Sequence, residues 1–308
     1  MTSTLETCAN ASARPSLTAA DAGDTLFQED IKQIIVWDGS AWYVYSADNA
    51  TGYDLDGTNS TTAVPLYHFD AEKFNGIDTS GNPSDATAID TSVVWKSRIG
   101  NVFASQATAA DQPQFKSSGT NSKPYILSNQ DYLVTNKAFR LDGPFTVFGV
   151  VESSGSQVSF IANGIEKDGA SGGAAPSYDP EKTVFFAYSS PANTSFIYYN
   201  DFGADNGSLP LTLSGGDMRT FIIPKNSSNQ TKVFMDGNNE DTNVVGTSTN
   251  PVYTGFLMAS AGGVYSTIGN TYEIALFDSD LSTADRNALG AYVQAKYGSS
   301  NAGWTNFS

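Results

Sequence analysis

Carboxylates are the side chains of this sequence with the clearest capacity for catalysis. Cleavage of a glycosidic bond needs two of them at a fixed separation, one acting as acid and the other as base or nucleophile. The glutamates from residue 152 onward stand apart from one another, at Glu152, Glu166, Glu181, Glu240 and Glu273. No Glu-x-Asp-x-Glu run places such a pair on one face of a strand. We therefore expect that the protein is not an enzyme.

A histidine-dependent site would have to use His68, the only histidine of the chain. Asp70 follows two residues later, on the same face of a strand, but no Gly-x-Ser-x-Gly turn accompanies the pair. We interpret His68 as an ordinary strand or rim histidine. The single cysteine, Cys8, excludes an internal disulfide, and one His with one Cys cannot complete a zinc site.

Calcium is the one ion for which the sequence offers ligands. Hard oxygen ligands gather in three turn segments, which are Asp54–Gly57, Asp201–Gly207 and Asp236–Asp241. None has the full spacing of a known calcium loop, and Asp and Asn are also the ordinary residues of turns. We expect no cofactor, with calcium at one of these turns as the alternative.

Charge and composition exclude several classes of partner. The formal net charge is −16, from 16 basic and 32 acidic residues. Such a surface repels phosphate backbones and anionic lipids, so we expect neither nucleic-acid nor membrane binding. The N-terminus has no basic region followed by an apolar run, so we expect no secretion signal, and no stretch is apolar enough to span a bilayer.

The elements that must position these residues are mostly strands. Short apolar runs alternate with turns rich in Gly, Asn, Asp and Pro, a pattern typical of two packed antiparallel sheets. The expected strands are Leu66–Phe69, Val93–Lys96, Lys123–Leu127, Tyr132–Val134, Phe145–Glu152, Gln157–Asn163, Thr183–Ala187, Ser195–Asn200, Leu209–Leu213, Arg219–Ile223, Lys232–Met235, Phe256–Ala259 and Asn270–Phe277. The sequence thus predicts an all-β sandwich.

A smaller unit precedes the sandwich. Residues 1–13 are expected to form a flexible arm, 14–46 a three-stranded β meander, and 47–63 a linker. An Asp-Gly turn separates Trp37 from the run that begins at Trp42, which is a strong hairpin signal. So small a meander buries little on its own, so its tryptophans need a neighbour to pack against. We predict that the meander anchors the protein to a partner.

One helix is expected, at the C-terminal end of the sandwich. Ser282 and Asp285 match a capping box, in which the serine hydroxyl accepts a helix amide and the acid reaches back to the cap. Apolar residues then recur at helical spacing until Gly298 ends the helix. Residues 299–308 form a polar tail that carries Trp304 and Phe307.

The stretch from Tyr272 to Gly298 resembles the closing strand and helix of laminin-G-like concanavalin A domains. These domains commonly end in a Glu-Ile strand, a Leu-Ser helix cap and a Lys-Tyr-Gly finish, all present here. Runs that begin at Val94, Lys123 and Gly143 look like further strands of the same domain. The resemblance implies a concanavalin A-like jelly roll over residues 64–298, and a structural hydrogen-bonding role for Glu273.

The N-terminal unit carries a second resemblance. Arg14-Pro-Ser, followed by Ile35-Val-Trp-Asp-Gly-Ser-Ala-Trp42, is similar to short segments of bacteriophage fibre and appendage proteins. This implies a virion structural protein on the particle surface, bound to other capsid or tail proteins and forming a homo-oligomer, with a trimer as the form expected of such appendages. The expected partner anchors are Trp37, Trp42, Trp304 and Phe307.

The leading hypothesis is therefore a non-catalytic virion appendage, either a capsid decoration or a tail fibre, that displays a lectin-like sandwich for attachment to host glycans. The alternative is a carbohydrate-binding module or a glycan hydrolase of the same fold. Exposed aromatics are the expected contacts with sugar rings. Those candidates are Tyr178, Tyr188, Tyr198, Tyr199 and Phe202.

Overall fold

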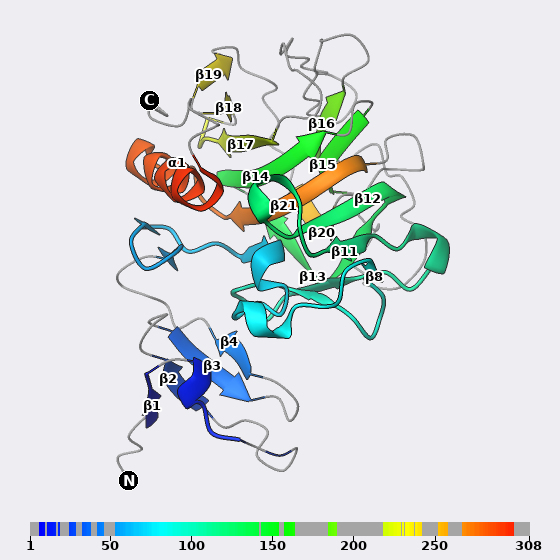
Figure 1. The fold of residues 1–308 in the computed structure, drawn as a ribbon. Coiled ribbons are helices and arrows are strands. Elements are labelled where there is room, and N and C mark those ends of the chain that lie inside the picture. Colours follow the sequence, from blue (N-terminus) through cyan, green and yellow to red (C-terminus); the bar gives the residue numbers. More distant parts are fainter. Residues whose placement is uncertain are drawn as a thin grey trace.

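Two antiparallel sheets form the body of the protein in its computed structural model (Figure 1). The larger sheet has nine strands. In spatial order they are β19 (Asn238–Asp241), β18 (Val233–Met235), β17 (Met218–Lys225), β14 (Phe145–Ser153), β21 (Thr267–Phe277), β12 (Tyr125–Asp131), β11 (Gln114–Lys116) and β8 (Thr87–Ala88), with β7 (Tyr67–Asp70) also paired to β21. The second sheet contains β20 (Val252–Leu257), β13 (Leu133–Leu141), β10 (Phe103–Ser105) and β9 (Trp95–Lys96).

The structure describes residues 6–9, 11–16, 18, 25–28, 33–37, 42–45, 53–141, 143–153, 157–163, 184–189, 218–228, 230, 232–236, 238–241, 252–257 and 267–298. The fold class predicted from the sequence, an all-β sandwich with a C-terminal helix and a small N-terminal β unit, is confirmed. The predicted strand over Gln157–Asn163 is β15, which pairs with β16 (Val184–Ser189). Two further predicted strands, at 195–200 and 209–213, lie outside the described residues.

The main core lies between the two sheets. Phe69, Val147 and Ile274 from the larger sheet pack in one apolar cluster with Trp95 and Leu133 from the smaller sheet. Alternate residues of a strand point to opposite faces, so the other residues of the larger sheet face away from this core. The larger sheet therefore needs a second covering layer.

Helix α1 (Thr283–Tyr297) supplies that layer (Figure 1). Its Leu289, Tyr292 and Val293 pack in a second apolar cluster with Phe148 and Val150 of β14. The predicted cap is confirmed, because the Ser282 hydroxyl accepts from the amide of Asp285 at 3.1 Å. The Asp285 carboxylate accepts hydrogen bonds from the Ser282 hydroxyl and from the backbone N–H of Thr62. In a capping box it would instead accept from the backbone N–H of Ser282. The acid therefore fastens a distant segment to the helix start.

That segment is a packed hairpin, where the sequence suggested a linker. Strands β5 (Tyr53–Asp54) and β6 (Ser60–Thr61) pair with each other, and Tyr53 and Leu55 are buried in the cluster under α1. The polar residues between the strands form a hydrogen-bonded turn around Asp56, which accepts the amides of Thr58 and Asn59. The Asp, Thr and Asn residues that bond the backbone of such a turn are also the common residues of loops, so the composition of this segment resembles that of a linker.

The N-terminal unit is a four-stranded sheet, in the order β1 (Glu6–Cys8), β2 (Thr25–Gln28), β3 (Gln33–Trp37) and β4 (Trp42–Tyr45). Strands β2 to β4 form the predicted meander, and Trp37 pairs with Trp42 across the hairpin. Strand β1 adds in parallel to β2, and a 3-10 turn, η1, spans Ala11–Ala13. The expectation of a flexible arm over residues 1–13 is therefore wrong where these two elements lie.

Arg14 connects this unit to the sandwich. Its guanidinium lies 3.4 Å from the Asp78 carboxylate, and both side chains are largely buried.

Among the described residues, no helix has the length and apolar character needed to cross a membrane.

Candidate functional site

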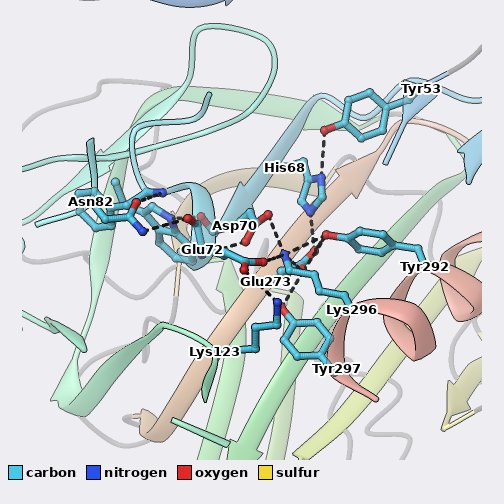
Figure 2. Close-up of polar contacts among 12 residues, drawn as sticks. Tyr53, His68, Asp70, Glu72, Asn82, Lys123, Glu273, Tyr292, Lys296 and Tyr297 are labelled. Carbon is cyan, nitrogen blue, oxygen red and sulfur yellow. Dashed lines mark hydrogen bonds and ion pairs between the residues drawn. The ribbon is translucent and has the colours of Figure 1, made fainter. Parts of the chain in front are cut away.

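The most concentrated polar chemistry of the described residues lies between α1 and the larger sheet (Figure 2). His68 of β7 and Glu273 of β21 are both fully buried, and Nε2 of the histidine lies 2.7 Å from Oε2 of the glutamate. The other ring nitrogen, Nδ1, is 3.0 Å from the Tyr53 hydroxyl. Two tyrosines of α1 complete the shell of Glu273, since the hydroxyls of Tyr292 and Tyr297 both donate to its carboxylate.

Lys296 joins this group from the last turn of α1 (Figure 2). Its ammonium lies 2.6 Å from Glu273, 2.7 Å from Asp70 and 3.5 Å from Glu72. Glu72 also binds Lys123 at 2.9 Å, at the half-exposed edge of the cluster. The carboxylates of the sheet side and the lysine of the helix therefore tie the two layers together.

The electrostatics of this buried network favour charged Glu273 and neutral His68. Burial alone would raise the pKa of Glu273, but the charge of Lys296 and the hydrogen bond from His68 hold that pKa well below its usual range. Burial lowers the pKa of His68 from its ordinary 6.5, against the opposing effect of Glu273. The pKa of Lys296 is raised well above 10.5, because Asp70 and Glu273 outweigh its own burial.

This network joins layers of the fold and offers little to a ligand. His68, Asp70 and Glu273 are each 0% exposed, and every oxygen of Glu273 is already engaged. The structural hydrogen-bonding role predicted for Glu273 agrees with this geometry. His68 lies on a strand, as one of the two predicted alternatives, and it is a core residue whose partner is Glu273.

A β-bulge connects this network to neighbouring residues on the same sheet face. Val150 of β14 pairs with Glu273, and Val151 pairs with Thr271, so Tyr272 is the extra residue of β21. A bulge re-aims the side chains of its strand, and here Tyr272 and Glu273 both contact the layer under α1. Tyr272 also contacts Tyr125 and Glu152, which belong to the same sheet face.

A row of four residues crosses four strands of this sheet face, and Tyr125 and Lys116 lie beside the row. We call these six residues the platform. Glu152 of β14 pairs with Asn270 of β21, Asn270 with Leu127 of β12, and Leu127 with Gln114 of β11. In the adjoining row Tyr125 pairs with Lys116. Gln114 is exposed and the other five residues are half-buried. Four strands at the usual spacing give a surface about 14 Å wide.

Hydrogen bonds hold one end of the platform in place. Glu152 accepts from the Tyr272 hydroxyl at 2.6 Å, from Asn270 Nδ2 at 3.1 Å and from the Thr120 hydroxyl at 3.0 Å. The carboxylate of Glu152 is thus hydrogen-bonded by neighbouring side chains of the protein, and it holds the side chain of Asn270 in position. Burial, together with the charge of Glu152, raises the pKa of the Tyr125 hydroxyl, which stays protonated at neutral pH.

Strained backbone borders the platform. Five of the described non-glycine residues have a positive φ, and Ala86, Asn121 and Ser122 are three of them. Ala86 precedes β8, and Asn121 and Ser122 lie in the 3-10 turn η6 (Thr120–Ser122) just before β12. The Asn121 amide donates to the backbone carbonyl of Tyr297, so the end of α1 holds this turn. Such strain clusters at functional sites.

The contacts predicted from the sequence stay predictions. Trp37, Trp42 and Tyr188 are on described strands, but their side chains lie outside the described part, and the remaining candidates (Tyr178, Tyr198, Tyr199, Phe202, Trp304 and Phe307) lie outside it altogether. Sequence reasoning missed Tyr125, because its strand run gives no sign of which neighbours it meets. The one available signal was the polar Glu152 at the end of an otherwise apolar strand.

The calcium alternative finds no support in the turns that are described. Asp54 accepts two turn amides, Asp56 accepts two more, and Asp236 binds Arg219 and the amide of Thr220. Within the described ranges, no three His, Cys, Asp or Glu side chains come together as a metal-binding group. The turn at 201–207 lies outside the described residues.

Comparison with known proteins finds similarity in structure alone. No protein-family model matches the chain, and no curated protein matches it in sequence. A sialidase of Trypanosoma rangeli is similar over 89% of this chain and 44% of its own, with 13% identity and a TM-score of 0.46. Domain 4 of a GH43 extracellular arabinanase from Geobacillus stearothermophilus is similar over 71% of this chain and 95% of that domain, with 11% identity and a TM-score of 0.44.

The binding domain of Paraclostridial Mosquitocidal Protein 1 is also similar, over 75% of this chain and 52% of its own, with 11% identity and a TM-score of 0.45. The chain spans less than half the length of two Trypanosoma rangeli sialidase structures that it resembles, at 34% and 44%. These similarities concern the fold and transfer no activity. They nevertheless overturn the expectation that the protein is not an enzyme, because glycan-cleaving enzymes stand among the similar structures, and we withdraw that expectation.

Proposed function

We propose that the protein is a carbohydrate-binding β-sandwich module whose glycan lies on the platform. The observation that carries this proposal is the partly exposed Tyr125 side chain, on the sheet face that also holds Lys116, Gln114 and Asn270. A ligand site of this kind combines an apolar surface with a few convergent polar groups.

Five of the platform residues divide into three roles in this proposal. The Tyr125 ring and the Leu127 side chain offer an apolar surface to a sugar ring, since an aromatic face favours C–H groups. Gln114 and Asn270 each carry both a donor and an acceptor, which suits sugar hydroxyls. Glu152 holds Asn270 and Tyr272 in place, so the polar groups are oriented before the ligand arrives.

The N-terminal sheet provides the attachment in our proposal. The resemblance of Arg14–Trp42 to phage appendage segments supports a place on a virion surface, with capsid or tail proteins as partners. A homo-oligomer would present several platforms together, and multivalency then compensates for weak binding at each one. The Arg14–Asp78 contact supports a defined placement of the platform relative to the attachment unit.

A glycan screen followed by calorimetry tests the proposal. The full chain is screened against immobilised neutral and acidic oligosaccharides, and the best ligand is titrated against the wild type, Tyr125→Ala and Tyr132→Ala. Tyr132 is half-buried as well, but it lies beyond the other end of β12. We expect Tyr125→Ala to weaken binding by on the order of tenfold or more, with Tyr132→Ala unchanged. The oligosaccharide is then recovered from the mixture and analysed by chromatography: an intact oligosaccharide indicates binding alone, and shorter products indicate cleavage. Equal affinities for all three proteins would refute the proposed site.

A further inference from the structure

The ammonium of Lys296 meets two carboxylates in a buried part of the protein. Its Nζ lies 2.7 Å from Oδ2 of Asp70 and 2.6 Å from Oε1 of Glu273. The side chains of both acids are 0% exposed, and that of Lys296 is 9% exposed. Aromatic rings lie around the contact, since Nζ is 5.4 Å from the ring centres of both Tyr292 and Tyr297. A lysine and an aspartate are therefore held together where water has little access.

The two acids meet this ammonium in different ways. Oε1 of Glu273 accepts a hydrogen bond from Nζ, and the same carboxylate accepts from the hydroxyls of Tyr292 and Tyr297. Oδ2 of Asp70 lies equally near to Nζ, yet among the described residues it has no hydrogen-bond partner. The contact with Asp70 is thus an ion pair without the geometry of a hydrogen bond. Glu273 is placed to exchange a proton with Nζ, whereas the Asp70 carboxyl group is the one left free to react.

The resting pair is ionised, but its neutral form is one proton transfer away. Burial alone would lower the pKa of Lys296, and the charges of Asp70 and Glu273 instead raise it well above 10.5. Transfer of a proton from Nζ to Oδ2 of Asp70 converts the ammonium and the carboxylate into an amine and a carboxylic acid. A buried setting favours this neutral form over separated charges. The amine is a nucleophile, and the acid is a better electrophile than the carboxylate.

We propose that Lys296 and Asp70 join in an intramolecular isopeptide bond, with Glu273 as the catalytic residue that moves the protons. The lone pair of Nζ attacks Cγ of the protonated Asp70, and one C=O electron pair moves to oxygen. Glu273 takes a proton from Nζ and gives it to the departing hydroxyl, so the C–O bond breaks and water leaves. Overall the ammonium and the carboxylate yield an amide and one water molecule. Glu273 returns to its carboxylate form, and no co-reactant is consumed.

The fold favours this product over the free pair. Two groups held in contact react as if at a concentration of about 10⁵ M or more when they are well oriented. The remaining carboxylate of Glu273 keeps its hydrogen bonds from Tyr292 and Tyr297 after the lysine charge is lost. The new bond joins the end of β7 to the last turn of α1. A link between positions so far apart in the chain restricts the unfolded state and secures the helix to the sheet.

Mass spectrometry of the intact, denatured full chain tests the inference. The wild type is expected to be lighter than its sequence by one water molecule. Lys296→Arg keeps the positive charge but forms no such amide, so it is expected to have its full sequence mass, as is Glu273→Gln. Lys123→Arg is the matched control and should still lack one water molecule, because the Lys123–Glu72 contact of 2.9 Å is about a quarter exposed. Circular dichroism establishes that each variant is folded.

The position of the missing water must also be located, because an Asp-Gly step such as Asp56–Gly57 can lose water by closing a succinimide. Proteolysis of the wild type followed by peptide mass mapping makes the distinction. A branched peptide that contains both Asp70 and Lys296 supports the inference. A wild type with its full sequence mass, a loss of water mapped to any other position, or the same branched peptide at undiminished yield in folded Glu273→Gln would each overturn it.

Discussion

The ring of Tyr125 lies against the ring of Tyr272, with 5.6 Å between their centres and 41° between their planes. Tyr272 in turn lies 5.8 Å from Tyr297, whose hydroxyl donates to Glu273 at 2.6 Å. Three tyrosines thus connect the platform to the buried network under α1. A change in either region is expected to affect the other through Tyr272.

Removing the Tyr272 hydroxyl tests this connection. Tyr272→Phe keeps the ring but takes one donor from Glu152 and one acceptor from the amide of Thr120. We expect a loss of about 1 kcal/mol in the free energy of unfolding, together with weaker glycan binding. Denaturant titration and calorimetry measure the two effects. A variant that binds as tightly as the wild type would show that Glu152 needs no such support.

Glu273 is the residue on which docking of α1 most depends. Glu273→Gln removes the carboxylate from its buried pair with Lys296 and sets an amide NH2 against the donors that surround it, so we expect unfolding to become easier by about 3–5 kcal/mol. Lys123→Met is the matched control, because it breaks a pair whose side chains are about a quarter exposed and which is worth about 0–1 kcal/mol. The urea concentrations at the midpoints of unfolding compare the stabilities of the two variants with that of the wild type. Equal losses in the two variants would contradict a central role for Glu273.

The buried histidine predicts a definite pH dependence. The pKa of His68 is lower in the folded protein than its ordinary 6.5, so below pH 6.5 the unfolded chain binds a proton that the folded protein does not. Stability therefore rises with pH in the interval from the folded pKa up to 6.5, by up to about 1.4 kcal/mol per pH unit. The depressed pKa of Glu273 acts in the same direction at lower pH, below its ordinary 4.5. In His68→Gln the free energy of unfolding, measured by denaturant titration, is expected to change less with pH just below pH 6.5. If its pH dependence is the same as in the wild type, groups other than His68 cause that dependence.

Asp285 joins the helix start to the β5–β6 hairpin. Its carboxylate accepts from the backbone amide and the hydroxyl of Thr62 and from the Ser282 hydroxyl. We expect Asp285→Ala to lower the free energy of unfolding by about 1–2 kcal/mol. Asp278→Ala, at an exposed position, is the control and should change little. Hydrogen exchange of Tyr53 and Leu55 should speed up in Asp285→Ala, and unchanged protection would mean that the hairpin holds itself in place.

Features set by neighbouring residues could be predicted from the sequence, and long-range pairs could not. The helix cap at Ser282 and the Trp37–Trp42 hairpin depend on a few adjacent residues, and both were foreseen. Asp285 meets Thr62 across 223 positions, and His68 meets Glu273 across 205. Such pairs follow from strand order, which short patterns do not encode.

The platform illustrates the same limit. Alternation along β14 places Glu152 opposite the main core, which the sequence can indicate. Its neighbours Asn270, Leu127 and Gln114 come from three other strands and meet only through their register. In the sequence the hairpin at Tyr53 resembles a linker because its turn is polar, while its two apolar residues are too few to signal burial.

A crystal structure of the chain bound to its best glycan from the screen is the most direct test of the proposed function. We expect a sugar ring on Tyr125, with its hydroxyls bonded to Gln114 and Asn270. A glycan held at any other surface, with the platform bare, would contradict the proposal.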